Sequence, residues 1–167
     1  MQNNTAQLKR SDLSLVKDLA YRVWPVSYAL VITEHQINYM LDLMYSTKKL
    51  EKDFDEGQQF YGYFENETLL GFITFENNHP STRQMKIHKL YVDTHSTKKG
   101  IGNTLVDCAK EYAKKTNMNE IVLNVNRKNP AIMFYQKIDF VIDREEIIDI
   151  GEGFVMDDYI MKYILPC

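Results

Sequence analysis

A glycine-containing segment with two adjacent lysines has the residue types that bind a phosphate group. It reads Lys98-Lys99-Gly100-Ile101-Gly102-Asn103 and follows an apolar stretch that is typical of a strand. Glycines allow backbone amides to approach a ligand closely, and a helix that begins here adds its partial positive charge. The segment has neither the Walker signature nor the dinucleotide-binding signature. The alternative is a glycine-assisted turn into a helix with solvated lysines.

A tyrosine in a second polar segment could take part in proton transfer. Residues 124–135 read NVNRKNPAIMFY, which indicates a strand end, a turn and the start of a helix that carries Tyr135. Ligands of open sheets commonly bind at the carboxyl ends of strands. A phenol is protonated at neutral pH, so Tyr135 could donate its proton to a leaving group. The alternative is an aromatic side chain that packs on the sheet beside Phe134.

The hydrophobic pattern predicts the elements that position these segments. Ser11 is expected to cap the first helix and Pro25 to end it, and Thr33 with Gln36 is expected to form a capping box at the start of the second helix. We expect helices over residues 12–23, 33–44, 47–54, 101–115 and 130–137. We expect strands over residues 59–64, 69–75, 85–92, 120–126, 140–150 and 154–164, with a further edge strand over 6–10. Hairpins around a central β–α–β unit predict an α+β fold with a mixed sheet, in a single domain over residues 1–167.

Composition and charge restrict the class of protein. The 20 Lys and Arg against 23 Asp and Glu give a net charge of −3, which argues against a general nucleic-acid-binding protein. No apolar run is long enough to span a membrane, and the first residues lack an apolar signal core, so we expect a cytoplasmic protein without membrane contact. Two cysteines are too few for a disulfide framework. No His or Cys pair has ligand spacing, so we expect no metal.

Together, in this order and spacing, the two segments resemble those of the GNAT superfamily of acyl-CoA N-acyltransferases. The family's pyrophosphate loop has the form Q/R-x-x-G-x-G/A, which here reads Thr97-Lys98-Lys99-Gly100-Ile101-Gly102. Its later segment has the form A-x-x-x-Y-x-x-x-G-F, and Ala131, Tyr135 and Phe140 stand at the matching positions. Thr97 replaces the usual Arg or Gln, which weakens one customary phosphate contact. Asp139 replaces a Gly whose φ is often positive, a conformation that Asp tolerates better than most residues.

The resemblance covers roughly residues 59–164 and implies a strongly bent mixed sheet flanked by helices. It implies acetyl-CoA as the acyl-donor substrate, with the backbone of Leu90, Tyr91 and Val92 paired with its pantetheine arm. Asn129 would contact the cofactor near the pantetheine, and Tyr135 would protonate the departing thiolate. The resemblance assigns the pyrophosphate to Lys98, Lys99, Gly100, Ile101, Gly102 and Asn103.

A base for the acceptor is also implied by the resemblance. Many relatives carry a Glu on the strand before the pyrophosphate loop, where it removes a proton from the amine. His88 stands at the matching position. An imidazole, which changes charge near neutral pH, suits that role. The alternative is a histidine with a purely structural place in its strand.

The resemblance implies transfer of an acetyl group to a primary amine by direct attack in a ternary complex. Segments expected to line the acceptor side carry the aromatic residues Trp24, Tyr28, Tyr39 and Tyr45 and the acidic residues Glu34, Asp42, Asp149, Glu152, Asp157 and Asp158. The alternative for these carboxylates is an ordinary solvated surface. An acidic, aromatic groove suits a small cationic amine, including a polyamine, and residues 32–54 are similar to bacterial polyamine acetyltransferases. The alternatives are a peptide or protein amine acetyltransferase, a non-catalytic acyl-CoA-binding regulatory module and a protein-interaction module. Family members often form homodimers through their terminal strands.

Overall fold

A computed structural model describes residues 4–96 and 99–166. Seven strands are hydrogen-bonded in the order β1-β2-β3-β4-β5-β7-β6. The pairing of β4 with β5 is parallel, whereas β1–β2, β2–β3, β5–β7 and β6–β7 are antiparallel. The predicted α+β class with a mixed sheet and flanking helices is therefore confirmed. The chain divides into two compact units, Met1–Glu76 with Lys89–Ala109 and Asn77–His88 with Lys110–Cys167, which are described in turn.

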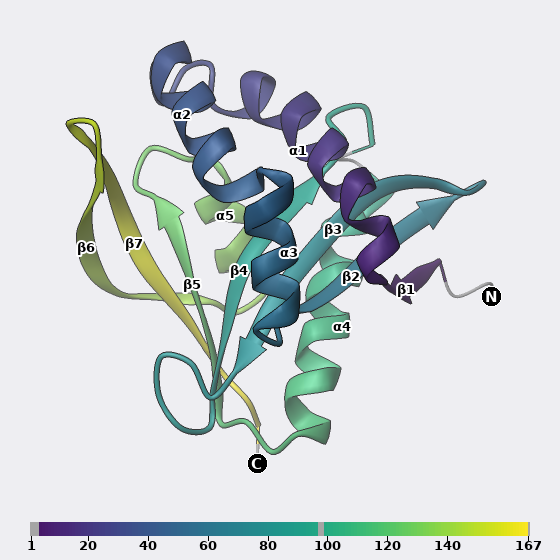
Figure 1. The fold of residues 1–167 in the computed structure, drawn as a ribbon. Helices are drawn as coiled ribbons and strands as arrows, with labels where there is room; N and C mark the ends of the chain where they lie inside the picture. Colours follow the sequence, from purple (N-terminus) through teal and green to yellow (C-terminus); the bar gives the residue numbers. More distant parts are fainter. Residues whose placement is uncertain (1–3, 97–98, 167) are drawn as a thin grey trace. The chain divides into compact units, whose positions relative to one another are not determined.

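The first unit combines an antiparallel hairpin with three helices. The strands are β1 (Thr5–Gln7), β2 (Gln59–Glu65) and β3 (Thr68–Asn77). A 3₁₀ turn, η1 (Arg10–Asp12), leads into α1 (Leu13–Ser27), which is followed by α2 (Glu34–Tyr45) and α3 (Thr47–Asp55). Figure 1 shows these three helices side by side. Their apolar positions recur every three or four residues, so each helix buries one face.

The ends of the first two helices follow partly from local chemistry. The predicted cap of α2 is confirmed, because the Thr33 hydroxyl accepts a hydrogen bond from the Gln36 amide at 3.2 Å. The prediction that Pro25 ends α1 is wrong. Pro25 lies inside α1, which continues to Ser27, and the Tyr28 amide bonds to the Trp24 carbonyl at 3.0 Å. Ser11 is not the cap of α1, because it lies inside η1.

Helix α4 (Ile101–Lys115) begins in the first unit, where it lies close to the sheet. Gly71 on β3 makes this possible. A Cβ atom built on Gly71 would lie 2.9 Å from the Ile101 side chain and 3.2 Å from the Tyr91 carbonyl oxygen. A larger residue at position 71 would therefore displace the N-terminal turn of α4, which carries the predicted phosphate loop.

The second unit is formed by the β5–β7–β6 strands and the first half of β4. Its elements are β4 (Gln84–Val92), β5 (Glu120–Asn126), α5 (Ala131–Lys137), β6 (Val141–Gly151) and β7 (Phe154–Ile164). The last strand, β7, lies between β5 and β6, and β6–β7 form the long hairpin in Figure 1. The β5 side chains are mostly buried, which is typical of a strand covered on both faces. Asp139 has a φ of 72°, which confirms that the turn after α5 needs a positive φ.

Candidate active site

The predicted phosphate loop ends at the start of α4, in the first unit. Gly100 has a φ of 75°, a left-handed conformation that residues with a Cβ adopt only at a cost. The Thr104 amide bonds to the Gly100 carbonyl at 3.1 Å, which begins the hydrogen-bond ladder of α4. Gly100, Ile101, Gly102 and Asn103 thus place a helix N-terminus in the loop, as the sequence predicts. Thr97 and Lys98 lie outside the described residues.

Asp93 organises the start of this loop, a role that the sequence analysis did not assign. Its carboxylate accepts a hydrogen bond from the His95 amide at 3.0 Å and forms an ion pair with Arg22 at 3.1 Å. Its backbone amide bonds to the Leu70 carbonyl at 2.7 Å. The Asp-x-His turn is a local signal that could have been recognised, because an Asp side chain often bonds to the amide two residues later. The contact with Arg22 spans 71 positions, so it could not have been recognised from the sequence.

Lys99 forms an ion pair within the first unit. Its ammonium lies 2.9 Å from a carboxylate oxygen of Glu65, and both side chains are about half exposed to solvent. An exposed pair of this kind contributes little to stability. A phosphate that approaches Lys99 would therefore compete with Glu65 for the ammonium group.

Aromatic rings surround the end of β4. The Tyr91 ring centroid lies 5.6 Å from that of Trp24 and 6.1 Å from that of Tyr45, and its hydroxyl is 3.0 Å from the Tyr28 hydroxyl. Trp24 is 1% exposed and Tyr45 is 0% exposed. The expectation that these two residues line an acceptor groove is therefore wrong, because they belong to the core. Leu90, Tyr91 and Val92 remain half-buried at the strand end.

A buried ion pair connects α3 to β4. Lys89 and Asp53 are buried, and the Lys89 ammonium lies 3.1 Å from an Asp53 carboxylate oxygen. Asp53 also accepts from Lys49. Burial lowers the pKa of Lys89, and the neighbouring Asp53 carboxylate opposes that effect. The alternation of β4 could have indicated this position, since Met85, Ile87 and Lys89 share one buried face.

Tyr135 lies on α5 in the second unit, where it is 8% exposed. Its ring packs edge-on against Phe140, with centroids 5.8 Å apart, and the Phe140 amide bonds to the Tyr135 carbonyl at 3.0 Å. The Phe134 ring is also close, at 5.2 Å between centroids, so Tyr135 has the neighbour that the structural alternative named. Asn129 precedes the same helix, and its side-chain oxygen accepts a hydrogen bond from the Ala131 amide at 2.8 Å. These contacts fix the orientation of the Tyr135 ring.

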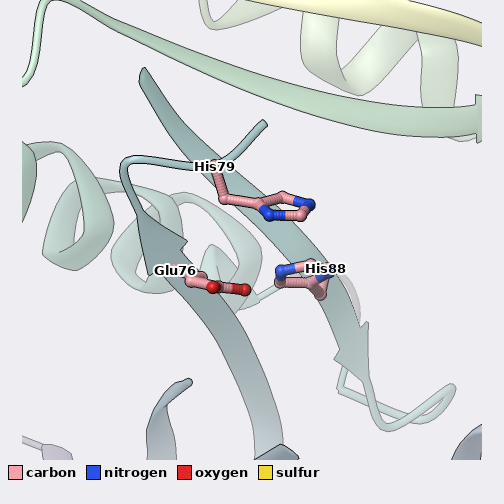
Figure 2. Close-up of side chains that lie close together, drawn as sticks. All are labelled: Glu76, His79 and His88. Carbon is pink, nitrogen blue, oxygen red and sulfur yellow. The ribbon is translucent and has the colours of Figure 1, made fainter. Parts of the chain in front are cut away.

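His88 lies on the half of β4 that belongs to the second unit. Figure 2 shows it with Glu76, at the end of β3, and His79, in the β3–β4 loop. The His79 and His88 ring centroids are 5.4 Å apart. Candidate metal-ligating atoms of the three residues all lie within 4.8 Å of one another. The two histidines are nine positions apart, which is not the short spacing of a common metal motif, so the sequence alone does not point to this group.

A buried carboxylate lies on the same face of the second unit's strands as His88. The register pairs Lys86 with Val122 and Asn126 with Asp158, so the even-numbered side chains of β4, β5 and β7 share a face. Asp158 is 2% exposed. The Asn124 amide nitrogen lies 3.3 Å from an Asp158 carboxylate oxygen and 3.0 Å from one of Glu146 on β6. Burial raises the pKa of Asp158 to about 6, and the Asn124 hydrogen bond opposes that shift.

The other carboxylates that were expected to attract a cation differ in their surroundings. Asp157 forms an ion pair with Arg127 at 2.8 Å, and Asp42 accepts from the Tyr21 hydroxyl at 2.8 Å. Glu34 lines a pocket of ≈ 340 Å³ together with Ile37 and Asn38. The charge of Asp157 is therefore balanced by Arg127. Asp158 instead shares the side-chain amide of Asn124 with the Glu146 carboxylate.

The predicted site residues are thus distributed over both units. Leu90–Val92 and Gly100–Asn103 belong to the first, and His88, Asn129 and Tyr135 belong to the second. Among the described residues, no helix is both long and apolar enough to cross a membrane.

Comparison with known proteins identifies the family. A sequence model of the Acetyltransferase (GNAT) domain matches residues 29–158. The chain is 29% identical over 157 residues to a spermidine N(1)-acetyltransferase of Thermoplasma acidophilum, a match that covers 90% of this chain and 93% of that protein.

Solved structures agree with that assignment. A crystal structure of PaiA N-acetyltransferase from Thermoplasma acidophilum in complex with coenzyme A superposes with a TM-score of 0.82, at 27% identity, over 96% of this chain and 97% of the other. A GCN5-related N-acetyltransferase structure from Rhodopseudomonas palustris gives the same TM-score of 0.82 at 16% identity, over 96% and 94% of the two chains, and supports the fold alone. The chain therefore belongs to the GNAT family of N-acetyltransferases.

Proposed function

We propose that this GNAT N-acetyltransferase transfers the acetyl group of acetyl-CoA to a primary amine of a small cationic molecule, with a polyamine as the preferred acceptor. The observation that carries the proposal is the match, over nearly the whole chain, to a spermidine N(1)-acetyltransferase. The related structure that contains coenzyme A supports the choice of donor.

The first unit would bind the donor. Gly100 and the N-terminus of α4 would present backbone amides to the pyrophosphate, with Ile101, Gly102 and Asn103 in the same turn. Lys98 and Lys99 would add positive charge. The backbone of Leu90, Tyr91 and Val92 would pair with the pantetheine arm, and Asn129 would contact the cofactor near the pantetheine.

The reaction would proceed by direct attack in a ternary complex. The amine nitrogen forms a bond to the acetyl carbonyl carbon, and the bond from that carbon to the CoA sulfur breaks. Tyr135 gives its proton to the departing thiolate, and His88 accepts the proton that the amine loses. The buried, ring-packed position of Tyr135 supports a fixed donor.

The carboxylates of the second unit support a cationic acceptor. Asp158 and Glu146 face the same Asn124 amide from neighbouring strands. A second ammonium group on the acceptor would lower the electrostatic cost of holding two carboxylates near each other.

A panel of acceptors tests the proposal. Release of the CoA thiol is measured with spermidine, with a monoamine of similar length and with a peptide α-amine. We expect the highest kcat/KM with spermidine. Turnover confined to the peptide would assign the protein to the peptide amine acetyltransferases. Acetyl-CoA binding without turnover of any amine would favour a non-catalytic regulatory module.

A further inference from the structure

Glu76, His79 and His88 form a half-buried group of metal-ligating side chains in a continuous stretch of chain, from the end of β3 through the loop to β4 (Figure 2). One carboxylate oxygen and two imidazole nitrogens lie within 4.8 Å of one another. We propose that these three residues bind a divalent transition-metal ion of the zinc type.

The donor set determines the class of ion. Imidazole nitrogen is a favoured ligand of Zn²⁺, Co²⁺, Ni²⁺ and Fe²⁺, whereas Mg²⁺ and Ca²⁺ prefer oxygen ligands throughout. Two imidazoles with one carboxylate therefore select a transition metal over Mg²⁺. Three protein ligands leave at least one coordination position for water or a further ligand.

The observed separations are close to those that an ion requires. Two ligands of a tetrahedral ion, each bonded at about 2.1 Å, lie about 3.4 Å apart. The 4.8 Å limit on the ligand-atom separations therefore leaves at most about 1.4 Å to close, a distance within the reach of side-chain rotation.

The loop that carries His79 is held in place by hydrogen bonds. The His79 amide bonds to the Gln84 carbonyl at 3.0 Å, which closes the loop across its base. The Arg83 amide bonds to the Asn78 side chain at 2.9 Å, and the Arg83 Nε bonds to the Asn117 carbonyl at 3.0 Å. Because the loop is fixed in this way, little conformational entropy is lost when an ion binds, and affinity rises accordingly.

If the proposed function holds, a metal ion at this site would affect acetyl transfer through His88. An ion bound by His88 occupies the imidazole that would otherwise accept the acceptor's proton. Zinc and acetyl transfer would then compete for one side chain, so that zinc acts as an inhibitor.

Calorimetry on the full chain tests the site directly. Zinc chloride is titrated, without acetyl-CoA or amine, into the wild type, His79→Gln, Glu76→Gln and the control His35→Gln, whose histidine lies on the exposed face of α2. We expect one ion per chain in the wild type and in His35→Gln. The affinity should fall at least tenfold in His79→Gln and in Glu76→Gln. Co²⁺ should give the visible absorption of a nitrogen- and oxygen-ligated ion in the wild type and lose it in His79→Gln.

Equal zinc affinity in the wild type and His79→Gln, or no binding to the wild type, would overturn the site. Circular dichroism of each variant shows whether it is folded, so loss of binding through unfolding is recognised. His79→Gln leaves the proposed catalytic residues intact, so zinc at a buffered free concentration should slow the wild type and spare this variant. Absence of activity with every amine would overturn the proposed function while the calorimetry still decides the metal site.

Discussion

At the scale of single residues, the hydroxyl of Tyr135 is the group on which the proposed chemistry most depends. Tyr135→Phe removes that hydroxyl and keeps the ring that packs against Phe140. We expect kcat to fall roughly 10²–10⁴-fold, because a positioned proton donor contributes about that much to a rate. Acetyl-CoA affinity should stay unchanged. Steady-state kinetics and calorimetry measure the two quantities.

Tyr61→Phe is a matched control, because the Tyr61 ring stacks on Phe75 in the first unit and is assigned no catalytic role. Turnover of Tyr135→Phe within a few-fold of the wild type would transfer the proton-donor role to another group or to water.

Asp158 should make the free energy of unfolding fall as the pH rises, which is the opposite of the usual effect of an aspartate. Its pKa is raised to about 6 by burial, with Glu146, Asp157 and Lys86 as its charged neighbours and Asn124 as its hydrogen-bond donor. A carboxylate whose pKa is raised on folding stabilises the folded state at low pH, and that contribution is lost as pH rises through about 6. The carboxylate of Asp158 therefore lowers the free energy of unfolding at neutral pH.

The Asp158→Asn variant removes this dependence. Between about pH 5 and about pH 7.5, the free energy of unfolding of the variant relative to the wild type should rise by about 1.4 kcal/mol. Urea denaturation at the two pH values measures the difference. An identical difference at both values would show that Asp158 does not titrate differently in the folded and unfolded chains.

At the scale of elements, the turn that begins α4 depends on the backbone of Gly100. Alanine at this position meets no neighbouring atom within 4 Å but must adopt a φ of 75°. The strain should shift the loop, and with it the amides that face the pyrophosphate. We expect Gly100→Ala to weaken CoA binding at least tenfold, or about 1.4 kcal/mol, by calorimetry.

A second glycine provides the control for backbone strain. Gly57, between α3 and β2, has a φ of 101° and also has no atom within 4 Å of an added Cβ. Gly57→Ala should lose about 1 kcal/mol of stability, as Gly100→Ala should, yet bind CoA like the wild type. Equal CoA affinity in the wild type, Gly57→Ala and Gly100→Ala would show that the turn at Gly100 does not contribute to the donor site.

Helix α3 is connected to β4 by the buried pair Asp53–Lys89. Asp53→Ala should lower the free energy of unfolding by about 3–5 kcal/mol, because it leaves the buried Lys89 ammonium without that carboxylate. The double variant Asp53→Leu with Lys89→Met should recover most of the loss, since it removes both charges. Urea denaturation measures each change.

Asp55→Ala is the matched control on the same helix. Asp55 is exposed and pairs with Arg10 at 2.5 Å, so its removal should cost less than about 1 kcal/mol. A similar loss for Asp53→Ala and Asp55→Ala would mean that the buried pair contributes no more than a surface one.

At the scale of the whole molecule, charge should determine the choice between amines. The net charge of −3 and the carboxylates of the second unit favour a cationic acceptor. The KM for spermidine should be lower than that for a monoamine of similar length, and the gap should narrow in salt, as the Debye length falls to about 3 Å at 1 M. Equal KM values at low salt would argue against a polyamine.

Two variants test which charges cause the preference for spermidine over the monoamine. Asp158→Asn should raise the KM for spermidine more than the KM for the monoamine, because it removes a buried charge beside Glu146. Asp107→Asn, an exposed change on α4 with the same effect on net charge, should raise neither. If both variants behave alike, the preference comes from net charge and not from Asp158.

The sequence by itself determined most of the local structure. Helix α2 and its Thr33 cap, the β2–β3 and β6–β7 hairpins and the glycine turn into α4 follow from short-range spacing and backbone preference. The two motifs were sufficient for the GNAT resemblance because each lies in one continuous segment. The predicted end of α1 was wrong, since the helix continues through Pro25 to Ser27 although a proline disfavours the helical conformation of the residue before it.

Only the tertiary structure decided which distant groups meet. The insertion of β7 between β5 and β6 brings Asp158 beside Asn124 and Glu146, while Arg127 neutralises Asp157. Folding also buries Lys89 against Asp53 and gathers Glu76, His79 and His88. These contacts depend on strand order and register, which are set by packing of the whole chain. Local pattern therefore predicts the elements and the cofactor motif, whereas the charge environment of the site emerges only from the folded structure.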